Sequence, residues 1–198
     1  NPVVKAFAAE MAVPAMEECM AALGGQGYME ENIIGRLVRD TMVEKIWEGT
    51  AAVLSLDLLR SMKVEGAWDA FLEWTMIIMA SVPRDLQEKL DGPIGFLRVA
   101  IKDLEAAYKP PMHPLVPRAA LFLFSYVASS LYLLEHAVWS FVSHQAERET
   151  DVEAFIRWVE EGGLKTVQED IKKILTSPET RSETDKALVY GKDARSKL

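Results

Sequence analysis

The chain has 198 residues, 49% of them hydrophobic and 26% charged, which is enough to bury the core of one or two compact domains. Its formal net charge is −8 and no basic stripe runs along it, which argues against nucleic acid and anionic lipid as partners. Cys19 is the single cysteine, so neither a disulfide framework nor a cysteine-based metal cluster is expected. No metal site is predicted either, because the three histidines lack ligand partners at metal-binding spacing.

Hydrophobic residues recur every three or four positions through most of the chain, and period-two alternation is nearly absent, which predicts an all-α fold. The first periodic run covers about residues 3 to 23. Pro14 should bend this helix or start a new helical segment, and Gly24-Gly25 should end it. A short helix is expected from Asn32 to about residue 40, and another starts at Glu48-Gly49-Thr50.

Beyond Gly66 the helical pattern continues. The expected segments, in chain order, are a helix closed by Pro83, a short helix over 84–90, a break at 91–93, a helix from Ile94, a proline-rich connector over 109–117, and helices over 118–145, 151–159 and 164–175. Pro178 should end regular structure, and a mobile polar tail should follow it.

The helix predicted around residues 119–143 is long enough to span a bilayer, for which about 20 apolar residues suffice. Glu135 and His136 lie within it, and a carboxylate at the bilayer centre costs roughly 2.5–3.5 kcal/mol on insertion scales. The central helix of a bundle is therefore the better interpretation, and no membrane span is predicted.

Glu48 is the residue with the clearest chemical potential. It follows the apolar Trp47 at a predicted helix start, with Gly49 behind it. A general base must be positioned and partly desolvated, and a helix start favours the ionised carboxylate. The residues alone leave two interpretations open, a proton acceptor and an ordinary helix-start glutamate.

Three motifs occur in a fixed order: Gly24-Gly25-Gln26-Gly27-Tyr28, Arg36-Leu37-Val38-Arg39-Asp40 and Ile46-Trp47-Glu48-Gly49-Thr50. Their order and spacing resemble the C-terminal helical domain of the acyl-CoA dehydrogenases. The segment from Trp47 to Arg60 is most similar to the AidB branch, which carries an extra helical region after this domain. The resemblance implies three parts: residues 1–65 in the family domain, a helical extension over 66–180, and a flexible tail over 181–198.

The family removes two hydrogens from an acyl-CoA thioester, and the resemblance implies the same α,β-dehydrogenation here. Glu48 falls on the position of the base that takes the α-proton. Gly49 falls where a backbone N–H contacts the thioester of the substrate. Trp47 replaces the usual tyrosine before the base and is expected to narrow the acyl pocket.

The family also binds FAD, and three further residues match its cofactor contacts. Thr50 matches a flavin contact, while Gly24 and Gly25 match residues that touch the adenine-nucleotide part of a neighbouring subunit's FAD. The second match implies a homo-oligomer. Ala21 and Ala52 depart from the family, which often has glutamine at both positions, so fewer FAD contacts are expected.

In the family, an N-terminal helical domain and a β-domain complete the flavin site, so the remaining domains of a longer polypeptide are expected partners. An alternative is that residues 66–180 form an oligomerisation or interaction module beside a vestigial flavin site. Its candidate anchors are Trp68, Trp74, Trp139 and Trp158, although core packing is the better interpretation of these residues. The AidB branch is associated with DNA, but the acidic extension argues against nucleic-acid binding.

The sequence ends in Ser196-Lys197-Leu198, a terminal tripeptide that peroxisomal import receptors read as an address. It predicts a peroxisomal protein with the import receptor as a further partner. In that compartment, an oxidase that passes electrons to oxygen is an alternative to a dehydrogenase.

Overall fold

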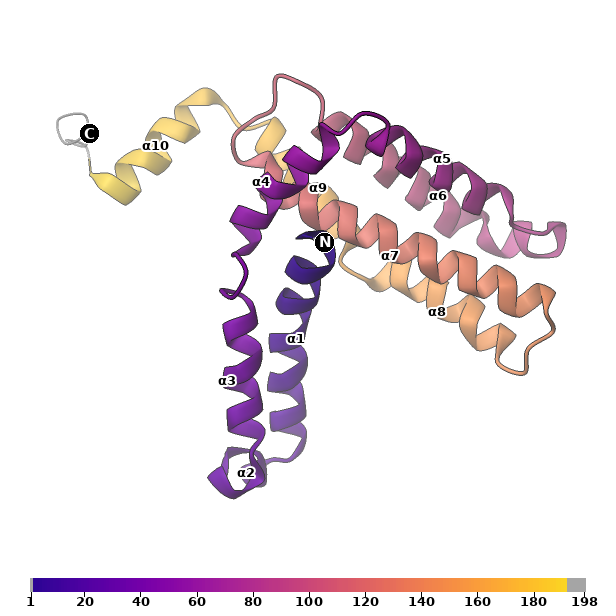
Figure 1. Ribbon diagram of the computed structural model, residues 1–198, viewed down its shortest axis with the longest axis horizontal. Helices are drawn as coiled ribbons and strands as arrows, with labels where there is room; N and C mark the ends of the chain where they lie inside the picture. The colour runs from indigo at the N-terminus through magenta and orange to yellow at the C-terminus, as the bar shows by residue number, and fades with distance from the viewer. Residues whose placement is uncertain (1, 192–198) are drawn as a thin grey trace.

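The computed structural model describes residues 2–191, and over this range the chain forms helices and no strand, which confirms the predicted all-α fold. Two helices, α1 (Pro2–Ala22) and α3 (Ile34–Glu44), lie side by side as an arm. The arm projects from a bundle formed by the helices that follow α4 (Figure 1). We call these two parts the arm and the bundle.

The tip of the arm holds two short elements, α2 (Gly25–Tyr28) and the 3-10 helix η1 (Glu30–Asn32). At the other end of the arm, α4 (Ala51–Met62) packs against both α1 and the bundle. Pro14 does not start a new helix, because α1 runs unbroken through it. The buried face of α1 is made of small residues, which allow neighbouring helices to approach closely: Val3, Ala6, Ala9 and Val13.

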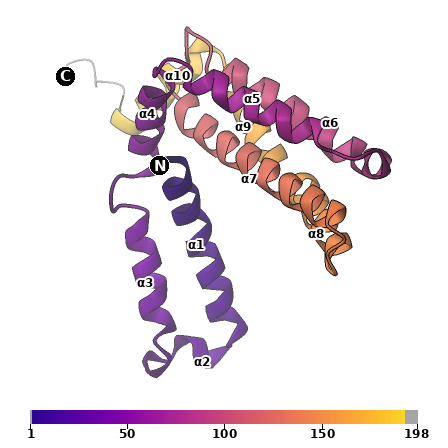
Figure 2. The same cartoon turned by 45° about the vertical axis from the view of Figure 1, so that its right-hand side comes forward.

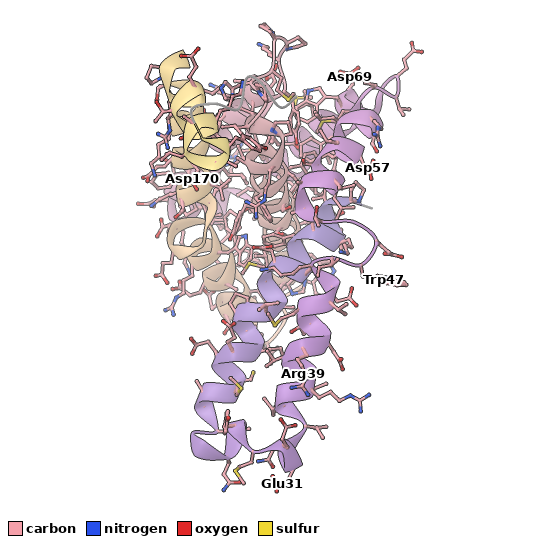
Figure 3. The ribbon with its side chains drawn as sticks, turned by 90° about the vertical axis from the view of Figure 1, so that its left-hand side faces the viewer. Glu31, Arg39, Trp47, Asp57, Asp69 and Asp170 are labelled. Carbon is pink, nitrogen blue, oxygen red and sulfur yellow. The ribbon has the colours of Figure 1, made fainter. Side chains whose placement is uncertain are left out.

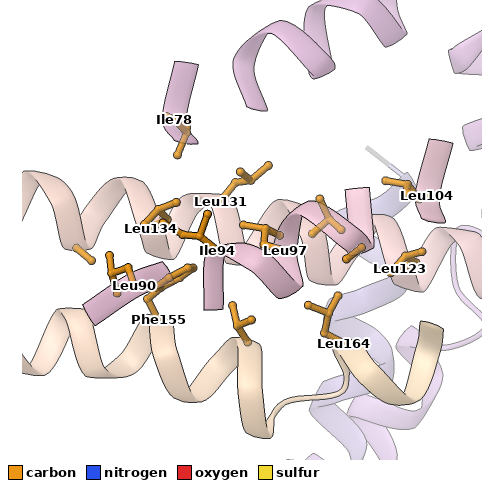
Figure 4. Packing of buried hydrophobic residues seen from close by; sticks show 14 of the residues in the cluster. Ile78, Leu90, Ile94, Leu97, Leu104, Leu123, Leu131, Leu134, Phe155 and Leu164 are labelled. Atoms are coloured by element: carbon orange, nitrogen blue, oxygen red, sulfur yellow. The ribbon is translucent and has the colours of Figure 1, made fainter. Parts of the chain in front are cut away.

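The bundle is built around one central helix. Its members are α5 (Ala67–Ala80), α6 (Arg84–Ala107), α7 (Val116–Val142), α8 (Arg148–Glu161) and α9 (Leu164–Leu175). Helix α7 contacts all four others and also α1 and α4 of the arm side. The residues that fill the space between α6, α7, α8 and α9 include Leu90, Leu97, Leu131, Leu134, Phe155 and Leu164 (Figure 4).

Within the described residues, α7 is the one helix long and apolar enough to cross a membrane by length and composition. Half of its most apolar 18-residue window is buried inside the protein. Glu135 and His136 lie on its exposed side. The position of α7 at the centre of the bundle matches the core-helix interpretation of the sequence.

The predicted break at 91–93 is wrong, because α6 runs unbroken from Arg84 to Ala107 with Pro93 inside it. Leu90, Ile94 and Leu97 are all buried on one face of this helix. Their burial on both sides of Pro93 offsets the roughly 3 kcal/mol that an internal proline costs a helix. Gly92 helps, because it has no Cβ to crowd the proline ring that follows it.

The sequence also predicts no regular structure after Pro178, whereas α10 (Glu179–Tyr190) follows it directly. A proline is tolerated at the start of a helix, where a missing N–H leaves no bond unmade. Helix α10 projects away from the bundle (Figure 1). In the turned view, the arm formed by α1 and α3 stays apart from α7 and α8 (Figure 2). Residues 192–198, which include Ser196, Lys197 and Leu198, lie outside the described residues.

Candidate functional site

The link between α3 and α4 carries four of the predicted site residues, Trp47, Glu48, Gly49 and Thr50. Trp47 has 62% of its surface exposed and points away from the arm (Figure 3). Glu48 is also exposed. The carboxylate of Glu48 and the indole ring of Trp47 are therefore both exposed to solvent where the arm joins the bundle.

The backbone turns sharply at the second half of the link. Glu48 has a φ of 56°, in the left-handed region that residues other than glycine rarely adopt. Gly49 follows with a φ of 114°. The N–H of Gly49, which the family resemblance assigns to the substrate thioester, donates to the carbonyl oxygen of Ile46 at 3.2 Å. The backbone of the link therefore has a defined turn conformation that is closed by a hydrogen bond.

Thr50 has a structural role as well as its predicted one. Its Oγ1 accepts a hydrogen bond from the N–H of Val53 at 3.5 Å, so it caps the start of α4. A hydroxyl that accepts in this way still has its own proton to donate. Thr50 is exposed, so that proton can reach a ligand.

Lys5 of α1 holds the link from the side of the arm. Its Nζ donates to the carbonyl oxygen of Glu44, the last residue of α3, and to that of Gly49 at 3.1 Å. No local sequence pattern identifies this residue, because it lies about 40 positions before its partners. The one local signal is its place between the buried residues Val3 and Ala6.

Glu10 of α1 makes a second connection, also missed from the sequence. One oxygen of its carboxylate lies 3.2 Å from Nζ of Lys45 in the link and 3.9 Å from the guanidinium of Arg118 in α7. All three side chains are at least one-third exposed, so the pairs contribute little stability. They nevertheless connect the link to the central helix of the bundle.

The tip of the arm carries the other two predicted residues, Gly24 and Gly25. Eleven residues of α3 separate the tip from the link, which corresponds to about 16 Å of helix. The structure therefore does not bring the glycines together with Glu48 within one chain. Both glycines are exposed, and a Cβ atom added at either would meet nothing within 4 Å. Their backbone is open to a ligand or a second subunit.

Gly27 is the glycine that packing requires, although the sequence pattern assigns it no role of its own. A Cβ atom at this position would lie 2.1 Å from the carbonyl oxygen of Met20. Because that atom belongs to the backbone of α1, it cannot move aside cheaply. Gly27 thus permits the close contact between α2 and α1 that shapes the tip.

Comparison with known proteins adds the identity of this region. Residues 1–63 match the sequence profile of the acyl-CoA dehydrogenase C-terminal domain. They form part of the C-terminal domain of an acyl-CoA dehydrogenase family member. We call residues 1–63 the acyl-CoA dehydrogenase segment.

Relatives extend beyond this segment. The chain is 33% identical over 159 residues to acyl-CoA dehydrogenase family member 11 of Caenorhabditis elegans, covering 75% of this chain and 26% of the relative. It is 38% identical over 74 residues to the putative acyl-CoA dehydrogenase AidB of Escherichia coli, covering 37% of this chain and 14% of the relative. The chain therefore spans about a quarter or less of the length of these two relatives.

A solved structure covers nearly the whole chain. The crystal structure of C. elegans ACDH-11 in complex with C11-CoA superimposes with a TM-score of 0.74 at 26% identity. The match includes 98% of this chain and 32% of the ACDH-11 chain. The arm and the bundle together thus have a counterpart in a member of the family.

The residues of the acyl-CoA dehydrogenase segment fit FAD as edge contacts rather than as an enclosing site. Gly24 and Gly25 offer open backbone, and Thr50 offers an exposed hydroxyl proton. None of the six predicted site residues lines the described pockets of about 460, 400 and 170 Å³. The 460 Å³ pocket lies instead at the base of α10, lined by polar residues such as Lys173 and Arg181.

Three of the four tryptophans predicted as candidate anchors in the extension pack against other residues of the chain. Trp68 and Trp74 pack against the bundle core, and Trp158 contacts Phe7 and Tyr126 at ring distances of 6.3 and 5.7 Å. Among these four tryptophans, Trp139 has the most open position, with 54% of its surface exposed. Large apolar side chains are exposed on the arm: Met11, Leu23, Ile33, Leu37, Met42 and Val43. Others are exposed on the extension: Met76, Ile77, Phe96, Val99, Tyr132 and Val142.

Proposed function

We propose that this chain is the C-terminal portion of an FAD-dependent acyl-CoA dehydrogenase or oxidase. The observation that carries the proposal is the exposed carboxylate of Glu48 on a fixed link that belongs to the acyl-CoA dehydrogenase segment. The complex of ACDH-11 with C11-CoA supports an acyl-CoA thioester as the substrate class. The match to AidB supports an AidB-like branch.

In this proposal Glu48 takes a proton from the α-carbon of the thioester. The electron pair left at the α-carbon forms the α,β double bond as the β-hydrogen leaves as hydride. A bound flavin would supply the hydride acceptor. Trp47 would lie beside the acyl chain and keep water from the carboxylate, since both side chains are displayed on the same link.

The remaining contacts come from backbone and hydroxyl groups. For Gly49 to donate to the thioester oxygen, its N–H must be shared with the carbonyl of Ile46, which it already contacts. Thr50 would donate a hydrogen bond from its hydroxyl group to the flavin while the same oxygen caps α4. Gly24 and Gly25 would contact the FAD of a neighbouring subunit, which agrees with their distance from Glu48 along α3.

Replacing Glu48 tests the assignment of the base. In the full-length protein, Glu48→Gln should lower kcat for an acyl-CoA substrate by about 10²–10⁴, the range that general base catalysis contributes. Glu44→Gln is the matched control, because Glu44 is an exposed glutamate at the other end of the same link. Full activity in Glu48→Gln would remove the proposed role. Hydrogen peroxide release during turnover would identify an oxidase.

We further propose that the arm is a subunit interface of a homo-oligomer. The support is the set of large apolar side chains exposed along α1 and α3, which a soluble surface seldom carries together. Met42→Lys should shift the full-length protein to a smaller species in sedimentation velocity. Trp139→Ala tests the alternative, the extension as an interaction module, and should leave the oligomer intact. The opposite pair of results would assign the interface to the extension.

The proposed location is the peroxisome, supported by the terminal tripeptide Ser196-Lys197-Leu198 as the sequence for an import receptor. A fluorescent fusion that keeps this C-terminus free should accumulate in peroxisomes. The same fusion without the tripeptide should remain in the cytosol, and peroxisomal accumulation of the truncated form would contradict the proposal.

A further inference from the structure

We propose that Lys5 is a positioning residue for Glu48, because its ammonium fixes the backbone of the link that displays the carboxylate. The catalytic meaning of this inference rests on the proposed role of Glu48. The contacts that carry it do not depend on that role.

One ammonium group joins the two ends of the link. Nζ of Lys5 donates to the carbonyl oxygen of Glu44, where α3 ends, and to that of Gly49, just before the cap of α4. Between these two carbonyls lie residues 45–48. The bridge therefore limits how far the ends of α3 and α4 can separate, and it anchors both to α1.

A cation suits this place for a physical reason. The last carbonyl groups of an α-helix have no partner within the helix, and the negative end of the helix dipole lies there. The ammonium of lysine has three donors, so it can serve two carbonyls at once with charge-assisted hydrogen bonds. The contact with Gly49 is partly buried, so water competes with it less than at an open surface.

The conformation of Glu48 explains why the bridge is needed. A left-handed φ of 56° is unfavourable for glutamate, and a link free to relax would move this residue to a negative φ. Such a change would redirect the side chain. The backbone hydrogen bonds donated by residues 45, 46, 47 and 49 of the link, for example from Trp47 to Val43 at 2.8 Å and from Gly49 to Ile46 at 3.2 Å, connect it to α3 or to itself. Lys5 connects the backbone of the link to α1, and the exposed Glu10–Lys45 ion pair adds a side-chain contact.

Removal of the bridge should therefore change the position of the Glu48 carboxylate more than the affinity of the protein for acyl-CoA. A misplacement of about 1 Å at a reacting group can cost on the order of 10² in rate. In the full-length protein, Lys5→Met keeps an unbranched side chain that is one atom shorter, and it removes the donors. It should lower kcat by about 10–100-fold while KM for the acyl-CoA stays within about twofold. Lys5→Arg retains a charged donor and should recover part of the loss.

Hydrogen exchange measures the link itself. Amide exchange in residues 45–50 should be about tenfold faster in Lys5→Met, as expected when a hydrogen bond to a charged group is lost. Lys63→Met, which removes an exposed lysine at the end of α4, should leave this exchange unchanged. In a Glu48→Gly background the effect of Lys5→Met should shrink, because glycine accepts a positive φ without strain.

Two results would overturn the inference in different ways. Unchanged exchange and unchanged kcat in Lys5→Met would show that the bridge does not position the link, whatever Glu48 does. Faster exchange in Lys5→Met combined with full activity in Glu48→Gln would refute the base assignment, and with it the catalytic role of Lys5.

Discussion

Tyr108 follows the last turn of α6 and contacts both hydrophobic clusters of the chain. Its ring lies 5.9 Å from that of Trp68 in an edge-on arrangement. Its hydroxyl is buried and has no hydrogen-bond partner among the described protein atoms. Burial raises the pKa of the Tyr108 hydroxyl well above its usual value of 10.0. The hydroxyl thus contributes a desolvation cost without the bond that normally offsets it.

We predict that Tyr108→Phe leaves the free energy of unfolding unchanged near pH 7 or raises it by up to about 1 kcal/mol, because no bond is lost. Above about pH 10 the unfolded chain loses the phenolic proton first, so the folded wild type should lose up to about 1.4 kcal/mol per pH unit from this group. Tyr108→Phe should remove that loss.

Urea denaturation of the two proteins between pH 7 and 11 measures the effect of Tyr108. Tyr132→Phe is the matched control, since Tyr132 has 63% of its surface exposed. Destabilisation of Tyr108→Phe by more than about 1 kcal/mol at pH 7 would reveal a partner for the hydroxyl.

At the residue scale, sequence motifs located the link and the glycines of the tip but not what holds them. Glu48 and Gly49 belong to a short contiguous motif, which spacing alone can identify. Lys5 and Glu10 act through contacts with residues more than 30 positions away, and no local pattern reports such contacts. The left-handed φ of Glu48 was also not predictable, because glutamate has no preference for that region.

At the element scale, α6 shows how packing overrides local signals. Its interior includes Gly92, Pro93 and Gly95, residues that usually interrupt helices. Helix periodicity correctly predicted its two halves, because Leu90 and Ile94 repeat the apolar spacing. The two halves form one continuous helix because they are buried against α7 and α8. These contacts exist only in the tertiary structure.

Two glycines at different helix positions should respond oppositely to alanine. Gly95 lies inside α6, and a Cβ atom added there would meet no atom within 4 Å, so Gly95→Ala should raise the free energy of unfolding by about 0.5–1 kcal/mol. Gly66 begins α5 at a φ of 77°, so Gly66→Ala should lower it by about 1 kcal/mol. Chemical denaturation of both variants checks the pair. A loss of stability in Gly95→Ala would mean that α6 is strained at that point.

At the scale of the whole molecule, an aromatic contact joins the arm to the bundle. The ring of Phe7 in α1 meets Tyr126 of α7 at 5.0 Å and Trp158 of α8 at 6.3 Å, both edge-on. Such pairs add about 0.5–1.5 kcal/mol each beyond the area they bury. These ring contacts therefore help to hold α1 against the bundle.

We predict that Phe7→Ala loosens this attachment. It should cost about 2 kcal/mol, less than the roughly 3–5 kcal/mol of a fully buried phenylalanine, because Phe7 is only half-buried. Amide exchange should accelerate in α1 and α3 while the core around Leu97 keeps its protection. Phe96→Ala, at an exposed ring on α6, serves as the control. Equal acceleration in both parts would indicate that arm and bundle open as one unit.

The central position of α7 also matters while the chain is being made. Both α1 and α4 pack on α7, yet 93 residues separate the end of α1 at Ala22 from the start of α7 at Val116. At the usual rate of about 5–20 residues per second, a ribosome needs roughly 5–20 s to cover that stretch. The face of α1 that packs on α7 stays uncovered throughout that interval, and the face of α4 stays uncovered for its last 53 residues, 63 to 115. These faces of α1 and α4 are therefore sites where a chaperone could bind the nascent chain before α7 is made.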